Sequence, residues 1–439
     1  MKAPPAARPA SAATPGPVDS RTGIIAHVLD LPVGPGEPRI FNSSVRMADS
    51  AALGAGSCYD QNGGAGLTRE AARAAAIGEG LERYCAAFSQ PDQVTVATWR
   101  GLAAGGHPPP GPAQYALFHR DQAEHAPHFG DDTPIAWLRA YSLSRAAWSH
   151  VPACLVHLPY LPQGRDVEEH IVGPAVSTGL ACAASRAEAV LSGLYEAIER
   201  DAFMISWLRE LPLGRVDLLS HPTIAEVYAT RLRRPGLDYH VLDMTTDLGV
   251  PAFLCLLLDQ RQDPPIACAG GAAHHDPAKA VLKALVEAAQ TREWAKYLCR
   301  TRAGTPAPSA DELTTFEDHV FHYASGGSAR ALEPFLDRPM VPLPAAGEPP
   351  ADHRTALDAV LGRLGAAGLE ALAVDLTTPD VAGCGYHVVK VMVPGLQPLY
   401  ADESRPLLGG HRLYARHPEA PCPRPAGPGD LNRAPHPYP

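Results

Sequence analysis

The sequence lacks the features that mark several large protein classes. Its nine cysteines are scattered and never form C-x-x-C, which indicates neither a disulfide framework nor a cysteine-based zinc site. No apolar run is long enough to cross a bilayer, and the N-terminus has no apolar stretch typical of a secretory signal. The net charge of −10 shows no excess of positive charge, which argues against a nucleic-acid or membrane-surface binder. We therefore expect a cytoplasmic protein.

Several familiar catalytic signatures are also missing. The chain has no G-x-x-x-x-G-K-[ST] loop, no kinase signature set and no G-x-S-x-G. His274 and His275 are adjacent, but no third ligand stands at metal spacing, so a zinc site is not expected there. Any nucleotide or metal site must therefore be built from other residues.

The composition and patterning of the chain are typical of a mixed α/β globular protein. With 439 residues, of which 19% are charged, the chain can bury a large core. We expect residues 1–22, rich in Pro and Ala, to be disordered, residues 23–415 to form the main folded domain, and residues 416–439 to form a Pro-rich tail. The patterning predicts helices over about 68–89, 186–209, 277–299 and 353–367, and strands near 134–142, 151–159, 239–246 and 250–260.

Short stretches rich in small residues precede the first two long helices. GGAG at 63–66 fits a helix-entry turn and a phosphate contact about equally well. STG at 177–179 is in the same relative place, where its hydroxyls favour a helix cap over a phosphate contact. The recurrence of strand, turn and helix hints at internal pseudo-symmetry.

The most informative pattern is a short phrase that three helices nearly share. It reads EGLER at 79–83, EAIER at 196–200 and EAAQTR at 287–292. In the first two, Glu, Glu and Arg fall at i, i+3 and i+4 and share one helix face; in the third, Arg292 lies further round. A single copy would be ordinary helix-surface decoration. Three copies, each within an apolar helix, predict an interior cleft.

Carboxylates that converge in a cleft repel one another unless cations lie among them. Mg²⁺ prefers carboxylate and phosphate oxygens, and guanidinium groups bind phosphate oxygens. The repeated phrase therefore predicts a divalent metal with a polyphosphate between the helices.

The last five residues alternate proline with other residues, as P-x-P-x-P. Alternating proline favours a stiff, extended, polyproline-like arm. A disordered tail is the alternative, but the strict alternation favours an arm that reaches a defined place.

Together these motifs resemble those of the YcaO-like family, in particular its azoline-forming cyclodehydratases. The family's S-x-x-E-x-x-E-R matches residues 76–83, with Ala76 in place of the serine, and its Gly-Lys-Gly corresponds to residues 64–66, with Ala65 in place of the lysine. E-x-x-x-R matches residues 196–200, and E-x-x-Q matches residues 287–290. The stretch VDLTTPDVAGCGYHVVKVMVPG, the later LLGGHRLY and the terminal P-x-P-x-P also match, so the resemblance covers roughly residues 40–439.

The resemblance implies a YcaO-type fold, with sheets flanked by helices and an ATP cleft between the glutamate-bearing helices. It implies that ATP is bound by Glu79, Glu82, Arg83, Glu196, Arg200, Glu287, Gln290, Arg292 and Gly66. It implies that Mg²⁺ is bound by Glu79, Glu82, Glu196, Glu199 and Glu287. It also implies that the carboxylate of Pro439 orients or deprotonates the substrate, on an arm stiffened by Pro435 and Pro437.

The resemblance further implies an ATP-dependent cyclodehydratase. A Cys, Ser or Thr side chain of a ribosomally made precursor peptide attacks the preceding carbonyl, ATP phosphorylates the former amide oxygen, and phosphate leaves to give thiazoline or oxazoline. Because only about 40 residues precede the resemblance, we expect a separate ThiF-like or winged-helix partner to bind the leader. A homodimer is also expected, with a flavin-dependent azoline dehydrogenase as a further partner where the rings are oxidised.

Two other functions stay open at this point. Thioamide or amidine formation would use the same ATP chemistry with a different nucleophile, although the P-x-P-x-P ending argues against it. A non-catalytic scaffold subunit of a peptide-modifying complex is the second alternative, and Ala65 and Ala76 are its best support.

Overall fold

The structure is a computed structural model that describes residues 16–53, 61–89, 93–105, 108–122, 124, 129–161, 170–327, 329–415 and 425–439. Strands and helices build three sheets, which confirms the predicted mixed α/β class. Residues 1–15 of the segment predicted to be disordered, and residues 416–424 of the predicted tail, lie outside the described residues. Within the described residues, no helix combines the length and the apolar character needed to span a membrane.

Three edge strands, one in each sheet, organise the fold. The first sheet has the order β1 (Ile25–Leu31), β2 (Phe41–Met47), β3 (Gln61–Gly66). The second has the order β4 (Val94–Ala97), β5 (Ile135–Ser142), β13 (Leu372–Asp375), β14 (His387–Met392), β7 (Leu180–Ala183), and β6 (Ala147–Pro152) also pairs with β5. The third has the order β11 (Ile266–Ala273), β10 (Ala252–Asp259), β9 (Leu237–Asp243), β8 (Gly214–Val216), β12 (Met340–Val341). Strands β3, β7 and β11 are therefore edge strands.

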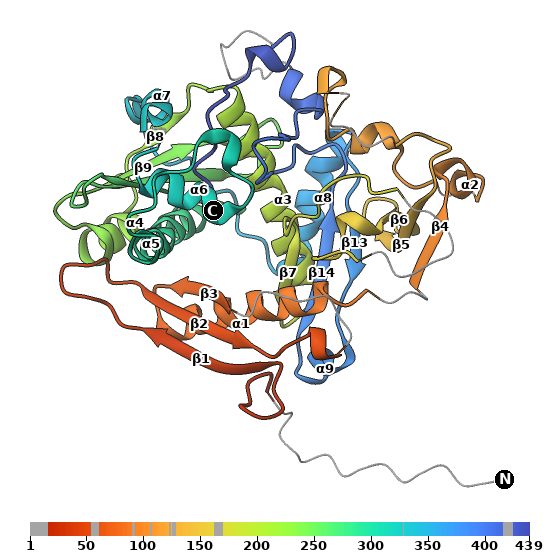
Figure 1. Ribbon diagram of the computed structural model, residues 1–439, viewed down its shortest axis with the longest axis horizontal. Helices are drawn as coiled ribbons and strands as arrows, with labels where there is room; N and C mark the ends of the chain where they lie inside the picture. The colour runs from red at the N-terminus through yellow and green to blue at the C-terminus, as the bar shows by residue number, and fades with distance from the viewer. Residues whose placement is uncertain are drawn as a thin grey trace.

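A long helix follows each of these edge strands and connects two sheets. Helix α1 (Arg69–Ala86) contacts β3 of the first sheet and β7 of the second, and α3 (Arg186–Leu208) contacts β7 and also β11 of the third. Helix α5 (Pro277–Thr301) contacts β11 and also β3. In Figure 1, α1 lies with the first sheet at the bottom, α5 at the left and α3 near the centre. The three helices thus join the three sheets pairwise around a common middle.

Side-chain caps explain where these helices begin. Thr68, Ser185 and Asp276 each accept a backbone N–H from the first turn of their helix. A cap of this kind stabilises a helix by about 1 kcal/mol. The predicted boundaries of these helices are confirmed to within a few residues, as is the later helix α8 (His353–Ala366).

GGAG does not form a helix-entry turn, which was one of its two open interpretations, and STG is not the helix cap that the sequence favours. GGAG forms the end of β3, and residues 177–179 come before β7, so Ser185 rather than Ser177 caps α3. The glycines are needed for packing. A Cβ on Gly64 would lie only 2.2 Å from the backbone nitrogen of Ala76 in α1, and glycine has none.

The remaining elements surround this frame. They are α2 (Trp99–Ala103), α4 (Pro222–Val227), α6 (Phe316–Ala324), α7 (Glu333–Leu336) and α9 (Pro379–Gly383). The strand predicted over 151–159 is wrong beyond Pro152, where the chain turns through a short 3-10 helix at Ala153–Leu155. The other predicted strands are confirmed by β5, β9 and β10.

Candidate functional site

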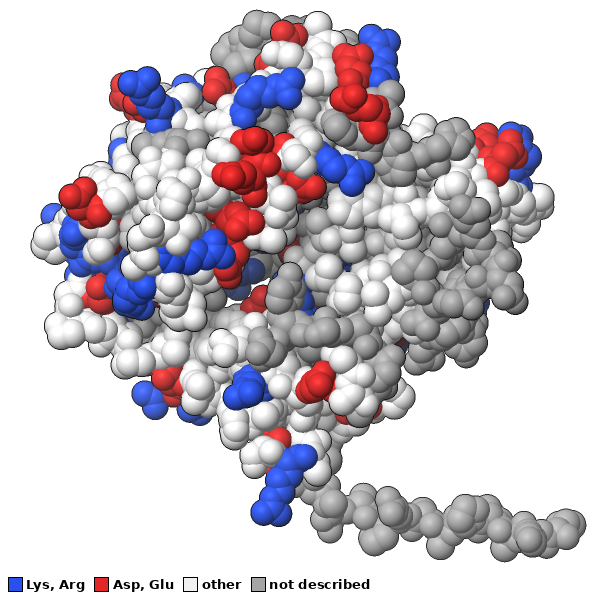
Figure 2. Space-filling view, in the orientation of Figure 1, with Lys and Arg blue, Asp and Glu red and all other residues white. Residues whose placement is uncertain are grey.

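A cavity of about 640 Å³ opens among α1, α3, α5 and the edge strands β7 and β11. In Figure 2 the face is hollowed near its centre, and acidic and basic side chains lie inside the hollow. The charged and histidine residues that line the cavity are Glu82, Glu188, Glu196, Glu199, Arg200, His274, His275, Lys279, Lys283, Glu287, Asp352 and His353. Four of the predicted glutamates and one predicted arginine therefore meet at one cavity.

The first glutamate of each phrase occupies the same position in its helix. Glu79, Glu196 and Glu287 each stand 11 residues beyond the cap residues Thr68, Ser185 and Asp276. Each carboxylate accepts the backbone N–H of a glycine in or beside the preceding edge strand, at 3.1 Å from Gly63, 3.3 Å from Gly179 and 3.2 Å from Gly271. The same helix–strand contact thus occurs three times.

In α1 and α5, the residue three positions after the first glutamate contacts a different edge strand from the one that precedes its helix. Glu82 accepts the backbone N–H of Cys182 in β7 at 2.9 Å. Gln290 lies beside β3, because a Cβ on Gly63 would be 3.4 Å from its Nε2. Each of these helices therefore contacts the edge strand of another sheet as well as its own. These contacts help to bring the three phrases close to one cavity.

Burial raises the pKa values of several of these carboxyls. Burial, with Glu196 nearby, raises the pKa of Glu82 well above its usual range, although Arg83 opposes the shift. Burial and the neighbouring Glu199 raise the pKa of Glu287 to about 8, and burial also raises the pKa of Glu196. Charged carboxylates in such surroundings gain from a bound cation.

The arrangement of the glutamates suits Mg²⁺ with phosphate rather than a closed protein cage. Among the described residues, the one set of three His, Cys, Asp or Glu side chains with all ligand atoms within 4.8 Å is His319, Glu403 and His436, which do not line the cavity. The glutamates are spread around the cavity instead. Mg²⁺ commonly takes one or two carboxylates and completes its shell with water and phosphate oxygens.

Arg83 and Arg200 retain donors that an anion could satisfy. The buried Nη1 of Arg83 meets no hydrogen-bond partner among the described residues, while its Nη2 lies 3.4 Å from Glu79. Arg200 lies 3.3 Å from Glu199 and 3.6 Å from Glu196, and its buried Nε has no aligned hydrogen-bond acceptor in the described structure. Phosphate oxygens are suitable partners for both side chains.

Arg292 does not face the cavity. It is fully buried and pairs with Asp259 at 2.6 Å, with Glu37 at 2.8 Å and with Glu293 at 2.5 Å. It stands five residues after Glu287 rather than four, so it projects from another side of α5. The structure thus gives no support to the predicted ATP contact of Arg292, which instead belongs to a buried ion-pair network.

Four other predicted ATP-binding residues also lie outside the cavity lining, namely Gly66, Glu79, Arg83 and Gln290. Gly66 packs against α1, where a Cβ would lie 2.8 Å from the side chain of Ala71. Helix packing explains this glycine without a phosphate. Glu79 and Arg83 lie near Glu82 of the lining, since both act on its pKa, and Gln290 lies beside Gly63 of β3.

Three lysines near the glutamates were missed by the sequence analysis. Lys279 and Lys283 line the cavity, and their places eight and four residues before Glu287 in the same helix were the available signal. Lys390 of β14 is buried and donates to the carbonyl of Val176. Burial lowers the pKa of Lys390 to about 8, with Glu196 opposing the shift. A lone lysine in the apolar strand HVVKVM was a sign of a buried partner.

The C-terminal tail contacts the second phrase. Tyr438 is fully buried, and its hydroxyl donates to Glu199. The guanidinium of Arg200 lies 4.1 Å from the centre of the Tyr438 ring. Gly271 of β11 leaves the space for this ring, because a Cβ there would lie 2.3 Å from the hydroxyl. The tail therefore ends between α3 and β11, beside the cavity.

Comparison with known proteins identifies the architecture. A family model described as YcaO cyclodehydratase, ATP- and Mg²⁺-binding, matches residues 63–397. A protein of Rhizobium leguminosarum bv. trifolii, described as an uncharacterized protein in the tfuA 3′ region, is 30% identical over 348 residues, which is 76% of each chain.

Two solved structures share the fold. A heterocyclase in complex with substrate and cofactor superposes with a TM-score of 0.73 at 24% identity, covering 96% of this chain and 56% of that one. This chain thus spans little more than half the length of that heterocyclase. The YcaO of Methanopyrus kandleri, bound with AMPPCP and Mg²⁺, superposes with a TM-score of 0.61 at 20% identity, covering 92% of this chain and 91% of that one.

Proposed function

The chain belongs to the YcaO family of ATP- and Mg²⁺-binding proteins, and on this premise we propose that it forms thiazoline or oxazoline rings from Cys, Ser or Thr residues of a ribosomally made precursor peptide. The observation that carries this proposal is the meeting of Glu82, Glu196, Glu199 and Glu287 at one cavity. Burial raises the pKa of three of them, Glu82, Glu196 and Glu287. A cavity built in this way suits a metal–polyphosphate complex better than an apolar ligand.

The roles of the residues follow from their positions. Glu82, Glu196, Glu199 and Glu287 would hold Mg²⁺, and Arg83 and Arg200 would bind phosphate oxygens. ATP supplies the phosphoryl group that turns a peptide oxygen into a good leaving group. Lys279 and Lys283 add positive charge to the same lining. The guanidinium groups would stabilise the charge that develops on the phosphoryl oxygens.

The substrate side of the proposal rests on the tail. Tyr438 reaches Glu199, so the end of the tail lies close enough to the cavity to meet a bound peptide. The role of the Pro439 carboxylate as an orienting group or base stays a prediction, as do the stiffening roles of Pro435 and Pro437. A separate leader-binding partner, a dehydrogenase and a homodimer likewise stay predictions.

Ala76, which replaces the serine of the family motif, gives only weak support to the alternative of a non-catalytic scaffold. This residue is fully buried in a core cluster with Val45, Met47 and Leu81, so its side chain packs rather than faces the cavity. The missing hydroxyl there therefore says little about nucleotide use. The thioamide alternative is separated by the product mass, because it exchanges oxygen for sulfur whereas cyclodehydration removes one water for each ring. Amidine formation with an amine of the same peptide also removes one water, so it is separated by locating the modified residue, which carries an amine rather than the side chain of Cys, Ser or Thr.

The test is ATP turnover together with peptide mass. The purified chain, a leader-binding partner and a precursor peptide from the neighbouring genes are incubated with Mg²⁺ and ATP. We expect ATP consumption that depends on the peptide and the loss of one water for each modified residue. Glu199→Gln should abolish both, whereas Glu333→Gln, an exposed change in α7, should not. Wild-type turnover in the Glu199→Gln protein would contradict the assignment.

A further inference from the structure

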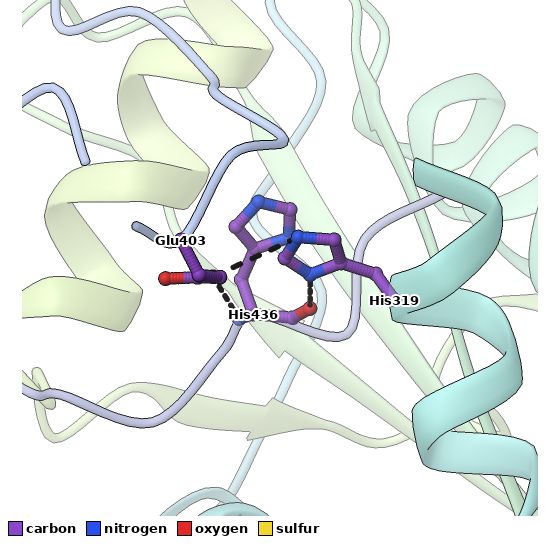
Figure 3. Close-up of side chains that lie close together, drawn as sticks. All are labelled: His319, Glu403 and His436. Atoms are coloured by element: carbon purple, nitrogen blue, oxygen red, sulfur yellow. Dashed lines mark hydrogen bonds and ion pairs between the residues drawn. The ribbon is translucent and has the colours of Figure 1, made fainter. Parts of the chain in front are cut away.

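Away from the cavity lining, three buried or nearly buried titratable residues gather around the C-terminal tail. His319 comes from α6, Glu403 from the segment after β14 and His436 from the tail (Figure 3). The histidines are fully buried, and the side chain of Glu403 is 9% exposed. None of the three residues belongs to the glutamate and arginine phrases, so the group needs its own explanation.

A metal ion does not fit this group. Imidazole binds zinc at about 2 Å, with the metal near the plane of the ring. The rings of His319 and His436 are stacked instead, with centroids 4.1 Å apart and planes inclined by 16°, so no nearby point lies in both planes. Three of the four ring nitrogens already face backbone carbonyl oxygens, at 2.7 Å for His436, 2.9 Å for Ala401 and 2.6 Å for Tyr400. The group is therefore a hydrogen-bonding site.

Acceptor atoms at this site pair with the few backbone N–H groups of the tail. Proline carries no N–H, so only His436 and Tyr438 offer a backbone donor between Pro435 and Pro439. A carboxylate oxygen of Glu403 accepts the backbone N–H of His436 at 3.3 Å. The Nδ1 atom of His436 accepts the backbone N–H of Tyr438, also at 3.3 Å. Both donors left by the proline alternation are thus satisfied.

The carbonyl groups of the tail are held as well. His319 Nδ1 lies 2.7 Å from the carbonyl oxygen of His436, and the Tyr323 hydroxyl donates to the carbonyl of Pro435 at 2.5 Å. Just upstream, the indole N–H of Trp207 donates to Ala434 at 3.1 Å. Such a density of contacts indicates a specific docking site for an extended segment, because an extended backbone has no internal hydrogen bonds of its own.

The docked tail delivers one side chain to the second phrase. Tyr438 follows His436 by two residues, and its ring enters between Phe203 and Gly271 to place the hydroxyl on Glu199. Without the tail, Glu199 would lose this donor and Arg200 would lose the ring beneath it. The position of the carboxylate therefore depends on how firmly the tail is held.

We propose that His319 and Glu403 are positioning residues that clamp the tail and thereby hold Tyr438 against Glu199 and Arg200. This inference rests on the function proposed above. Neither clamp residue lines the cavity, so both act through the tail. A displacement of about 1 Å at a reacting centre can cost on the order of a hundredfold in rate, which sets the scale of the expected effect.

The test compares two substitutions at Glu403 in the full-length protein. Glu403→Ala removes the acceptor for the His436 N–H, and Glu403→Gln keeps a carbonyl oxygen in its place. Hydrogen exchange of the C-terminal peptide reports directly on the tail, and kcat and KM for ATP are measured in parallel. Glu317→Ala, which removes a half-exposed carboxylate that lies on the same helix as His319 and pairs with Arg302, is the control.

We expect Glu403→Ala to lose tail protection and to lower kcat about a hundredfold, with KM for ATP changed less than about twofold. Glu403→Gln and Glu317→Ala should retain both protection and kcat. His319→Phe, which keeps the ring stack and removes both ring nitrogens, should behave like Glu403→Ala and gives a second variant if the first does not fold. Retained tail protection in the two disruptive variants, or lost protection with wild-type kcat, would overturn the clamp. An inactive wild-type protein would contradict only the proposed function, because the exchange measurement still decides whether Glu403 holds the tail.

Discussion

Helices α3 and α5 carry similar phrases and use their arginines in opposite ways. In α3, Arg200 stands four residues after Glu196, lines the cavity and lies over the Tyr438 ring. In α5, Arg292 stands five residues after Glu287, is fully buried and pairs with Asp259. One residue of spacing turns a side chain by about 100° around a helix with 3.6 residues per turn. A similar sequence motif can therefore place its arginine at a cavity in one helix and in the core in another.

The largest expected effect concerns the arginine that faces the cavity. Arg200→Met should lower peptide-dependent ATP turnover by about a hundredfold or more, because one charge-stabilising donor is lost from the phosphoryl-transfer site. Turnover is measured per folded protein, because Glu196 and Glu199 lose a partly buried partner and the variant should also lose stability. Arg186→Met, at the exposed start of the same helix, is the matched control and should keep wild-type turnover. Equal turnover in the two variants would remove Arg200 from the site.

Arg292 should give the opposite result. Arg292→Met leaves Asp259 and Glu37 with Arg261 and Lys296 as remaining partners, so the loss of stability should be near the lower limit for breaking a buried pair, about 3 kcal/mol. Chemical denaturation measures this loss. The folded fraction should keep its kcat. A stable Arg292→Met protein with no turnover would show that the comparison between the two arginines is wrong.

The carboxyl pKa values predict how Mg²⁺ should act on stability. Burial raises the pKa of Glu287 from 4.5 to about 8, so the folded protein binds more protons than the unfolded chain between these values. Stability without Mg²⁺ should therefore fall as the pH rises from about 4.5 to about 8. Mg²⁺ and a nucleotide should oppose this fall, with a larger stabilisation at the higher pH. Thermal unfolding across this range tests the sign, and a stabilisation independent of pH would contradict it.

A smaller effect is expected at the position where the first phrase departs from the family motif. Ala76→Ser would place a hydroxyl in the core beside Met47 and Leu81. A serine in a helix can donate to the carbonyl four residues earlier, so the loss of stability should be only about 1 kcal/mol. KM for ATP should not change, as steady-state kinetics would measure. A marked decrease in KM would show that the side chain at this position reaches the nucleotide.

The sequence allowed prediction of the parts that depend on periodicity and failed where packing decides. The long helices follow from their apolar spacing, although Ser185 and not the STG stretch caps α3, and the convergence of Glu82, Glu196, Glu199 and Glu287 follows from the repeated phrase. GGAG fits a helix-entry turn and a phosphate contact about equally well from sequence, because glycine is usual in turns and allows close approach of a phosphate. Here α1 lies so close to β3 that no side chain fits at Gly64 or Gly66, and only the folded structure shows that closeness.

Contacts between distant parts of the chain were also beyond sequence reasoning. The P-x-P-x-P ending predicted a stiff arm, but nothing in it pointed to the residues that hold it, His319 and Glu403. Arg292 of helix α5 shows the same limit, since its partner Asp259 belongs to strand β10, 33 residues earlier. Local patterns give the orientation of a side chain on its own helix, and its neighbours come from segments that are distant in the sequence.

The central claim is that three helices contribute to one nucleotide–Mg²⁺ site. Nucleotide binding to variants of each helix tests this claim most directly. Calorimetric titration of AMPPCP at saturating Mg²⁺ is measured for the wild-type protein and for Glu82→Gln, Glu199→Gln and Glu287→Gln, one substitution in each helix. The account predicts that each substitution weakens binding by about tenfold or more, which is about 1.4 kcal/mol. Wild-type affinity in any one of the three variants would contradict it, because that helix would then lie outside the site.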